Sequence, residues 1–395
     1  MTPSVPSMRD TRIDVIRALI LLSIFINHVP HNPLEFLTHK NFGFSDAAEA
    51  FVLISGLSAG MAYSSKFQTG KALAATIKAW RRAGVLYVSQ LCTTLFTLGS
   101  FGFFAALWTR PDLMEKIAIR PVMEHPAEAF AGIVLMTHQL GYNNILSIYV
   151  VMLLMLPPMM LLGKRNVGAM LGLSFAIWLV CGLLQIGPPN WPMEGIWFLD
   201  PLSWQFLFFI GVAAILHIRA GGSLPRHPAL IGLAAGYLIL SLLWVRIPLW
   251  GVDVSFGLPK VLTGFNKTFL STFRLVHVLA AAYLIVAIAP LSQLFRRPLA
   301  NPLAIMGRHA LPVFIAGTLL AMVLQPLRMV VEPAPVLDAL LVIAGCALLF
   351  ALVYWLEFLG RLKRRATAPA LQKERSGNGS MVARMDKPRI PEKIA

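Results

Sequence analysis

The residues best suited to chemistry near the start of the chain share one face of an apolar helix. Arg17 and His28 are 11 residues apart, which is about 1,100° of rotation and about 16.5 Å of helix axis. Asp14 falls on the same stripe. Ionisable groups inside an apolar helix usually face a cavity or a partner, and histidine can act as a general base near neutral pH. Two interpretations stay open: these groups serve an interior site, or Asp14 pairs locally with Arg17 and His28 marks the membrane interface.

A second set of polar residues opens the next apolar segment. Asp46 and Glu49 are three residues apart, so they lie on one helix face. Such carboxylates could orient the imidazole of His28 or bind a hydroxylated substrate; alternatively, Asp46 caps the helix. Gly56 and Gly60 form a small-xxx-small motif that suits close helix packing.

Later segments add charged and aromatic candidates. Arg274, three residues before His277, is placed to meet an anionic acyl group, and Arg308 to meet a phosphate, although snorkelling to the headgroups explains either arginine equally well. Three tryptophans in one connection form a platform for sugar rings or an aromatic belt: Trp191, Trp197 and Trp204. No metal site is predicted, because prolines interrupt helical spacing among the candidate ligands His28, His31, His39, Asp46 and Glu49.

Composition identifies the elements that must position these residues. Of 395 residues, 57% are hydrophobic and 13% charged, which excludes a soluble or disordered chain and favours an all-α, polytopic membrane protein. About ten transmembrane helices are expected, near residues 13–29, 47–64, 85–108, 145–162, 168–187, 203–217, 230–247, 275–292, 308–325 and 338–359.

Charge distribution predicts the orientation of these helices. Most of the 34 lysine and arginine residues fall in the tail and in the connections that lie on one side when both termini are cytoplasmic. The net charge of +16 is therefore a topology signal beside anionic lipid, and no nucleic-acid partner is expected. Two parts follow: a membrane domain at 1–365, and a basic, cytoplasmic tail at 366–395 whose composition predicts disorder.

Several of these segments together resemble a known family. The matching blocks are Arg9-Asp10-x-Arg12-x-Asp14-x-x-Arg17, Ile24-Phe25-x-Asn27-His28-x-Pro30-x-Asn32, Phe42-Gly43-Phe44-Ser45-Asp46-Ala47-Ala48-Glu49, Lys267-Thr268, Arg274-Leu275-x-His277 and Gly307-Arg308-His309. They resemble the OpgC family, inner-membrane enzymes that succinylate osmoregulated periplasmic glucans. Arg17-x₁₀-His28 also fits the signature of the broader acyltransferase-three superfamily.

The resemblance implies an O-succinyltransferase of the bacterial inner (cytoplasmic) membrane. Its donor would be succinyl-CoA, or acetyl-CoA, used as a substrate, with no permanently bound cofactor. Its partners would be a periplasmic glucan, the lipid bilayer and a glucan synthase machinery. The predicted catalytic residues are His28, Asp46 and Glu49; the donor-binding residues are Arg12, Asp14, Arg17, Arg81 and Arg308; the acceptor-binding residues are Ser45, Trp191, Trp197, Trp204, Arg274, His277 and His309.

The expected mechanism is direct transfer. Arg17 and the basic 66–82 segment would hold the CoA phosphates, and His28 would deprotonate a glucose hydroxyl that attacks the thioester. A covalent intermediate on Ser55 is disfavoured because no base is adjacent to it in sequence. Two alternatives stay open: an O-acetyltransferase for another envelope polysaccharide, and a transporter of glucan or organic anions that uses the same charges as a relay.

Overall fold

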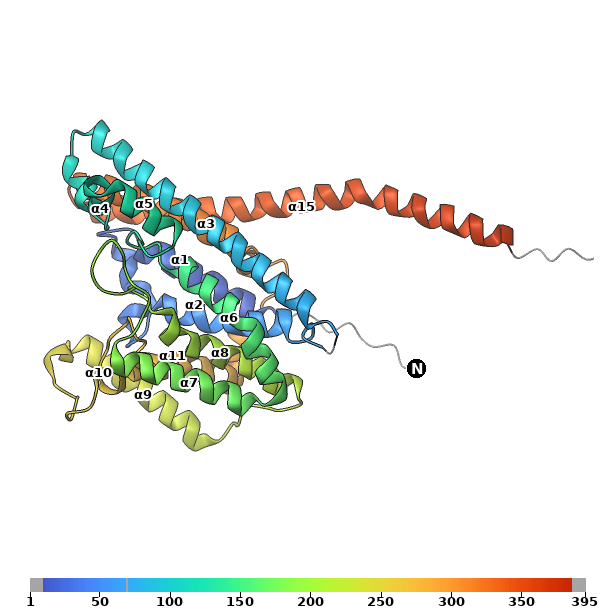
Figure 1. Ribbon diagram of the computed structural model, residues 1–395, viewed down its shortest axis with the longest axis horizontal. Coiled ribbons are helices and arrows are strands. Elements are labelled where there is room, and N and C mark those ends of the chain that lie inside the picture. Colours follow the sequence, from blue (N-terminus) through green and yellow to red (C-terminus); the bar gives the residue numbers. More distant parts are fainter. Residues whose placement is uncertain (1–9, 69, 386–395) are drawn as a thin grey trace, which may run out of the picture. The chain divides into compact units, whose positions relative to one another are not determined.

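The computed structural model describes residues 10–68 and 70–385, with the backbone alone for residues 364–385. The described residues form helices joined by turns and loops (Figure 1). The longer helices are α1 (Arg12–Asn27), α2 (Ala47–Tyr63), α3 (Ala72–Leu107), α6 (Ile145–Arg165), α7 (Val167–Leu184), α8 (Pro201–Arg219), α9 (Pro228–Arg246), α11 (Thr272–Ala287), α14 (Ala310–Val330) and α15 (Pro335–Met385). The shorter ones are η1 (Pro33–Leu37), η2 (His39–Asn41), η3 (Pro111–Glu115), α4 (Arg120–Glu124), α5 (Pro126–Val134), η4 (Leu249–Gly251), α10 (Lys260–Thr263), α12 (Ala289–Phe295) and α13 (Pro302–Arg308).

Each of the ten predicted apolar segments overlaps one of the longer helices. Among the described residues, seven helices are long and apolar enough to cross a membrane, or eight if α11 and α12, which meet at a 96° bend, count as one span. The helices α1 and α2 have 16 and 17 residues, which is about 25 Å and shorter than a typical hydrocarbon core of about 30 Å. The count of ten spans and the cytoplasmic termini stay predictions.

Two boundaries differ from those expected. The third helix begins at Ala72, not near residue 85, because residues 72–84 are rich in Ala, Lys and Arg, which favour helix without raising hydropathy. The backbone of α15 is helical as far as Met385, through much of the tail predicted to be disordered; residues 386–395 lie outside the described part. Contacts divide the chain after Cys346, and both cavities described below lie in the first unit.

The helices that carry the predicted site pack against one another. Helix α1 contacts α2, α13 and α14, while α2 contacts α8, and α6 contacts α3, α7 and α8. Glycine allows the closest approach: a Cβ on Gly56 of α2 would lie 2.0 Å from the carbonyl oxygen of Phe208 in α8, and one on Gly211 would lie 2.6 Å from that of Leu53. The backbones of α2 and α8 therefore meet where a side chain would separate them.

This contact yields a stability prediction. Gly56→Ala should lower the free energy of unfolding by about 1–3 kcal/mol, because the added methyl overlaps a backbone that cannot move independently. Gly99→Ala on α3 is the matched control, because a Cβ there meets nothing within 4 Å. Thermal unfolding in detergent measures both; equal midpoints for the two variants would contradict the close packing of α2 on α8.

The long connection between α3 and α6 is folded rather than extended. It contains η3, α4 and α5, and three of its residues, Leu113, Ile119 and Leu140, are fully buried with Phe101 of α3 in one hydrophobic cluster. Burial of these side chains holds the connection against the end of α3. This positions its neighbouring residues over the outer cavity described next.

Candidate functional site

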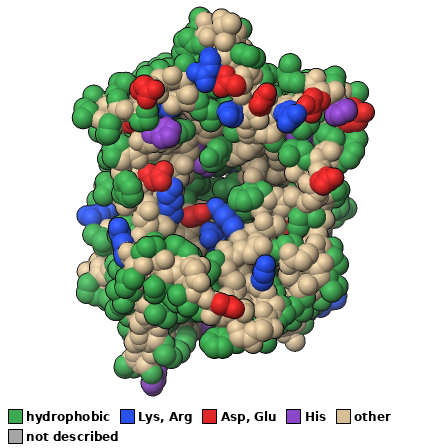
Figure 2. Space-filling model, turned by 90° about the vertical axis from the view of Figure 1, so that its left-hand side faces the viewer, with side chains coloured by type: hydrophobic (Ala, Val, Ile, Leu, Met, Phe, Trp, Pro, Cys, Tyr) green, Lys and Arg blue, Asp and Glu red, His purple; other side chains and the backbone are tan. Residues whose placement is uncertain are grey.

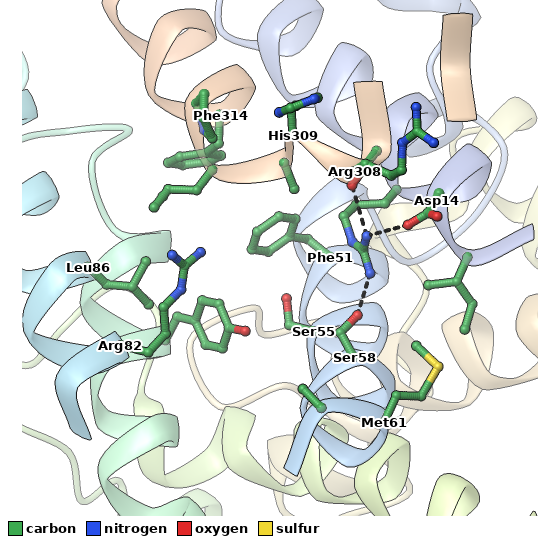
Figure 3. Close-up of a pocket in the computed structure, with 18 of the residues that line it drawn as sticks. Asp14, Phe51, Ser55, Ser58, Met61, Arg82, Leu86, Arg308, His309 and Phe314 are labelled. Atoms are coloured by element: carbon green, nitrogen blue, oxygen red, sulfur yellow. Dashed lines mark hydrogen bonds and ion pairs between the residues drawn. The ribbon is translucent and has the colours of Figure 1, made fainter. Parts of the chain in front are cut away.

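Arg17 is held rigidly on α1. Its Nη1 atom donates to Asp14 Oδ1 at 3.0 Å and to the carbonyl oxygen of Gly307 at 2.9 Å, and Nη2 donates to Ser58 Oγ (Figure 3). These partners come from α1, α13 and α2, so the guanidinium ties three helices together. The local Asp14–Arg17 ion pair is therefore present, and Arg17 also faces a cavity.

That cavity, the inner cavity, has a volume of about 840 Å³. Arginine is its most frequent polar lining residue, with Arg17, Arg82 and Arg308. Arg82 projects from α3 on one side and Arg308 lies across from it (Figure 3). Its other polar lining residues include Asp10, Asp14, Ser55, Ser58, Tyr149 and His309. Guanidinium groups present several N–H donors in a planar fork that matches phosphate and carboxylate oxygens. The inner cavity is thus suited to a large anionic ligand.

A second cavity, the outer cavity, has a volume of about 590 Å³ and contains His28. Its charged lining residues are Lys40, Asp46 and Lys267, and its uncharged polar ones include Asn27, Gln139, Tyr142, Asn144 and Asn190. Figure 2 shows the face that bears α4, α5 and α10, where a hollow is bordered by basic and acidic side chains. This mixture of amide, hydroxyl and charged groups suits a hydroxyl-rich ligand.

The two cavities adjoin along the same helices. Helix α1 contributes Arg17 to the inner cavity and His28 to the outer one, and α2 contributes Ser55 and Asp46 in the same order. On α6, the consecutive residues Ile145 and Leu146 line different cavities. Neighbouring residues at the start of α6 therefore border both cavities.

His28 is the first residue after α1; its backbone is held by a hydrogen bond and its side chain by packing. Its carbonyl oxygen accepts a hydrogen bond from Gln325 Nε2 at 2.9 Å, and its ring lies 4.8 Å from the Tyr142 ring centroid. Its Nδ1 atom is buried and has no hydrogen-bond partner among the described residues. The imidazole is thus positioned by packing and retains capacity to bind a proton or a ligand.

Asp46 and Glu49 form an ion-pair network with basic residues from the other end of the chain. Glu49 Oε1 accepts from Arg274 Nε at 2.6 Å, and Asp46 Oδ2 pairs with Arg274 at 3.4 Å and with Lys267. Glu49 also accepts from the backbone N–H of Asp46, while Asp46 accepts from that of Ala48, which completes a capping box. The capping interpretation of Asp46 is confirmed.

Comparison with protein-family models identifies the family of this chain. A model described as OpgC protein matches residues 9–361, which include both cavities and the ion-pair network. The chain belongs to the OpgC family. Comparisons with curated proteins and with solved structures give no match. Membership implies a membrane acyltransferase, in agreement with the apolar helices.

The block Phe-Gly-Phe-Ser-Asp-Ala-Ala-Glu of this OpgC chain mainly joins helices. Ser45 Oγ lies 2.7 Å from His277 Nδ1, and both side chains are buried. The ring of Phe44 lies 4.9 Å from that of Phe265, within a larger aromatic cluster. A Cβ on Gly43 would lie 1.9 Å from His277 Nε2. This contact joins the start of α2 to α11, and acceptor binding by Ser45 and His277 stays a prediction.

Other predicted acceptor residues also lie away from the outer cavity of this OpgC protein. Trp204 is fully buried and its indole N–H donates to the carbonyl oxygens of Lys267 at 3.0 Å and Thr268 at 3.1 Å. Trp197 is 4% exposed. Trp191 is 40% exposed, but its neighbour Asn190 lines the cavity, together with Phe198. Burial leaves Trp191 as the exposed member of the three, and the sugar platform stays a prediction.

Three further predicted site residues of this OpgC protein, His309, Glu49 and Arg274, lie outside the outer cavity. His309, predicted to bind the acceptor, lines the inner cavity instead. Glu49 was predicted to act with His28 and Arg274 to bind the acyl group. Neither residue lines a cavity, and the two form an ion pair with each other. Among the described side chains, no group of three or more His, Cys, Asp or Glu residues is arranged to hold a metal ion.

Two predicted donor-binding arginines of this OpgC protein also lie elsewhere. Arg12 does not line the inner cavity: it pairs with Asp10, which does, and donates to Ser292 Oγ at 2.6 Å. Arg81 lines a separate groove with Lys78, whereas Arg82 lines both that groove and the inner cavity. Because the 66–82 segment is helical from Ala72, consecutive arginines point about 100° apart. Arg82 had a predicted role only as part of the basic 66–82 segment, whereas Ser58, Tyr149 and Lys267 are among the lining residues to which the sequence assigned no role.

Proposed function

We propose that this protein is a membrane-embedded O-acyltransferase that moves a succinyl group from cytoplasmic succinyl-CoA to hydroxyls of osmoregulated periplasmic glucans. The observation that carries the proposal is the placement of Arg17 and His28 in adjoining cavities on one helix. An arginine-lined cavity suits a phosphorylated donor, and a cavity with a histidine and amide groups suits a sugar. Family membership supports the acyl-transfer chemistry.

In the proposed reaction, the donor occupies the inner cavity with its phosphates near Arg82 and Arg308. Its acyl thioester reaches His28 past the level of Ile145 and Leu146, where the cavities adjoin. His28 takes the proton of a glucose hydroxyl, and the oxygen attacks the thioester carbonyl. The carbon–sulfur bond then breaks, and the CoA thiolate recovers the proton from the imidazolium.

Direct transfer remains the preferred route within this proposal. Ser55 lines the inner cavity, whereas His28 lines the outer one, so a covalent Ser55 intermediate would lack His28 as its activating base. The hydroxyl-rich acceptor and the base share the outer cavity. A single displacement therefore needs only the donor to cross between cavities.

The test compares glucans from cells with and without the protein by mass spectrometry. Succinyl mass increments that require the protein support the proposal. Acetyl increments would change the donor to acetyl-CoA and keep the chemistry, and acetylation of another envelope polysaccharide would change the acceptor. Altered export of unmodified glucan or organic anions would favour the transporter and overturn the proposal.

Arg82 provides a prediction on donor binding. Arg82→Gln should raise the donor concentration for half-maximal rate by about 10-fold or more, because a charge-assisted hydrogen bond to phosphate contributes about 1.5–3 kcal/mol. Arg81→Gln, one residue away and outside the inner cavity, is the matched control and should change this concentration little. Steady-state kinetics with varied succinyl-CoA measure the effect, and equal shifts for both variants would remove the inner cavity from donor binding.

A further inference from the structure

The charged residues of the outer cavity are few and differ in how they are paired. Lys40 lies 2.7 Å from Glu35, and both side chains are about one-third exposed. Asp46 pairs with both Lys267 and Arg274. Among the described residues that line this cavity with His28, Lys267 is therefore the cation linked to the buried network.

That network is a chain of alternating charges, and Lys267 is its end member. The order is Glu49, Arg274, Asp46 and Lys267. If the ammonium of Lys267 turned away from Asp46, that carboxylate would keep Arg274 and the backbone N–H of Ala48. No charge in the network would be left without a partner. Lys267 can thus change partner without the penalty of stranding a buried charge.

The backbone of Lys267 is fixed while its side chain reaches the cavity. Its carbonyl oxygen accepts from the buried indole of Trp204 at 3.0 Å, and its Nζ atom lies 5.8 Å from the centroid of the Phe198 ring. The side chain is 26% exposed. An ammonium has three N–H donors on a flexible four-carbon stem, so it can accept a second anion beside Asp46.

We propose that Lys267 binds a carboxylate at the far end of the transferred acyl group, and thereby makes the enzyme prefer dicarboxylic acyl donors over uncharged ones. This inference rests on the proposed acyl transfer with His28 as the base. In a succinyl group, two methylenes separate the reacting carbonyl from the free carboxylate. The carboxylate must therefore enter the cavity that holds His28, where it leaves water and needs a cation.

This assignment differs from the one predicted for Arg274. The guanidinium of Arg274 is 13% exposed and already contacts two carboxylates, so a third anion there would add repulsion from Asp46 and Glu49. Lys267 contacts one of these carboxylates and faces the ligand space. We therefore assign binding of the acyl carboxylate to Lys267, the member of the network that lines the cavity, and not to Arg274.

The test uses the purified full-length protein with glucan and two donors of equal chain length, succinyl-CoA and butyryl-CoA, which lacks the carboxylate. Wild type should prefer succinyl-CoA. Lys267→Met should lower kcat/KM for succinyl-CoA by about 10- to 100-fold and change that for butyryl-CoA by less than about 3-fold. Lys267→Arg should keep most of the preference. Lys260→Met, an exposed lysine outside the cavity, is the matched control.

The possible outcomes distinguish the role of Lys267 from the acyl-transfer function on which it rests. A wild-type succinyl preference that falls only in Lys267→Met supports the role of Lys267. An unchanged preference in that variant, or an equal loss with both donors, overturns it while leaving acyl transfer intact. Wild-type protein that transfers neither group would overturn the proposed function, and the inference with it.

Discussion

Replacing His28 with asparagine is expected to reduce acyl transfer by at least about 100-fold, the usual contribution of a general base. The imidazole is the proton acceptor of the proposed reaction and lies in the cavity assigned to the sugar. The amount of succinylated glucan, measured by mass spectrometry and normalised to the protein in the membrane, gives the size of the effect.

The structure explains why this variant should still fold. The hydrogen bond that joins His28 to α14 uses its backbone carbonyl, which asparagine also provides, and its Nδ1 atom has no partner among the described residues. His125→Asn is the matched control, because that exposed histidine lies outside both cavities. Near wild-type transfer by His28→Asn would show that another group removes the proton.

Of the variants considered, Arg274→Met should lower the free energy of unfolding most. It leaves Glu49, which is fully buried, without its cation, and breaking a buried ion pair in this way typically costs about 3–5 kcal/mol. A matched comparison is Arg110→Met, which removes an exposed pair with Asp112 in which both side chains are 42% exposed and should change the unfolding midpoint little. Thermal unfolding in detergent measures both variants.

A double variant distinguishes a lost charge partner from lost packing. Glu49→Gln combined with Arg274→Met removes both charges, so it should recover much of the stability that Arg274→Met loses. The amide of glutamine can still accept from the backbone N–H of Asp46, which preserves the cap. If the double variant were no more stable than Arg274→Met, packing around Arg274 would be the dominant contribution.

Local patterns in the sequence predicted the helices and the polar faces of the first two. The spacing of Arg17 and His28 depends only on helix geometry, so their common orientation towards adjoining cavities follows from counting residues. The capping box of Asp46 and Glu49 is equally local, since both partners lie within one turn. Family membership was also recoverable, because it rests on motifs along 9–361.

Partners distant in the chain could not be predicted in this way. Arg274 meets Glu49 across 225 residues and Lys267 meets Asp46 across 221, and no periodicity within one helix encodes which other helix it faces. The same limit explains the tryptophans: hydropathy placed Trp204 near an interface, whereas tertiary packing buried it completely against the backbone of Lys267.

Sequence alone therefore determined the class of protein, the helices and the placement of Arg17 and His28 on one face of α1, because these depend on composition and on spacing within a helix. The tertiary structure decided which charges neutralise one another and which of them line a cavity. The reason is that a buried carboxylate needs a cation beside it, and the packing of the helices decides which cation that is. Glu49 and Arg274 became the core of a structural network, and Lys267, paired with Asp46, became its end member in the cavity of His28.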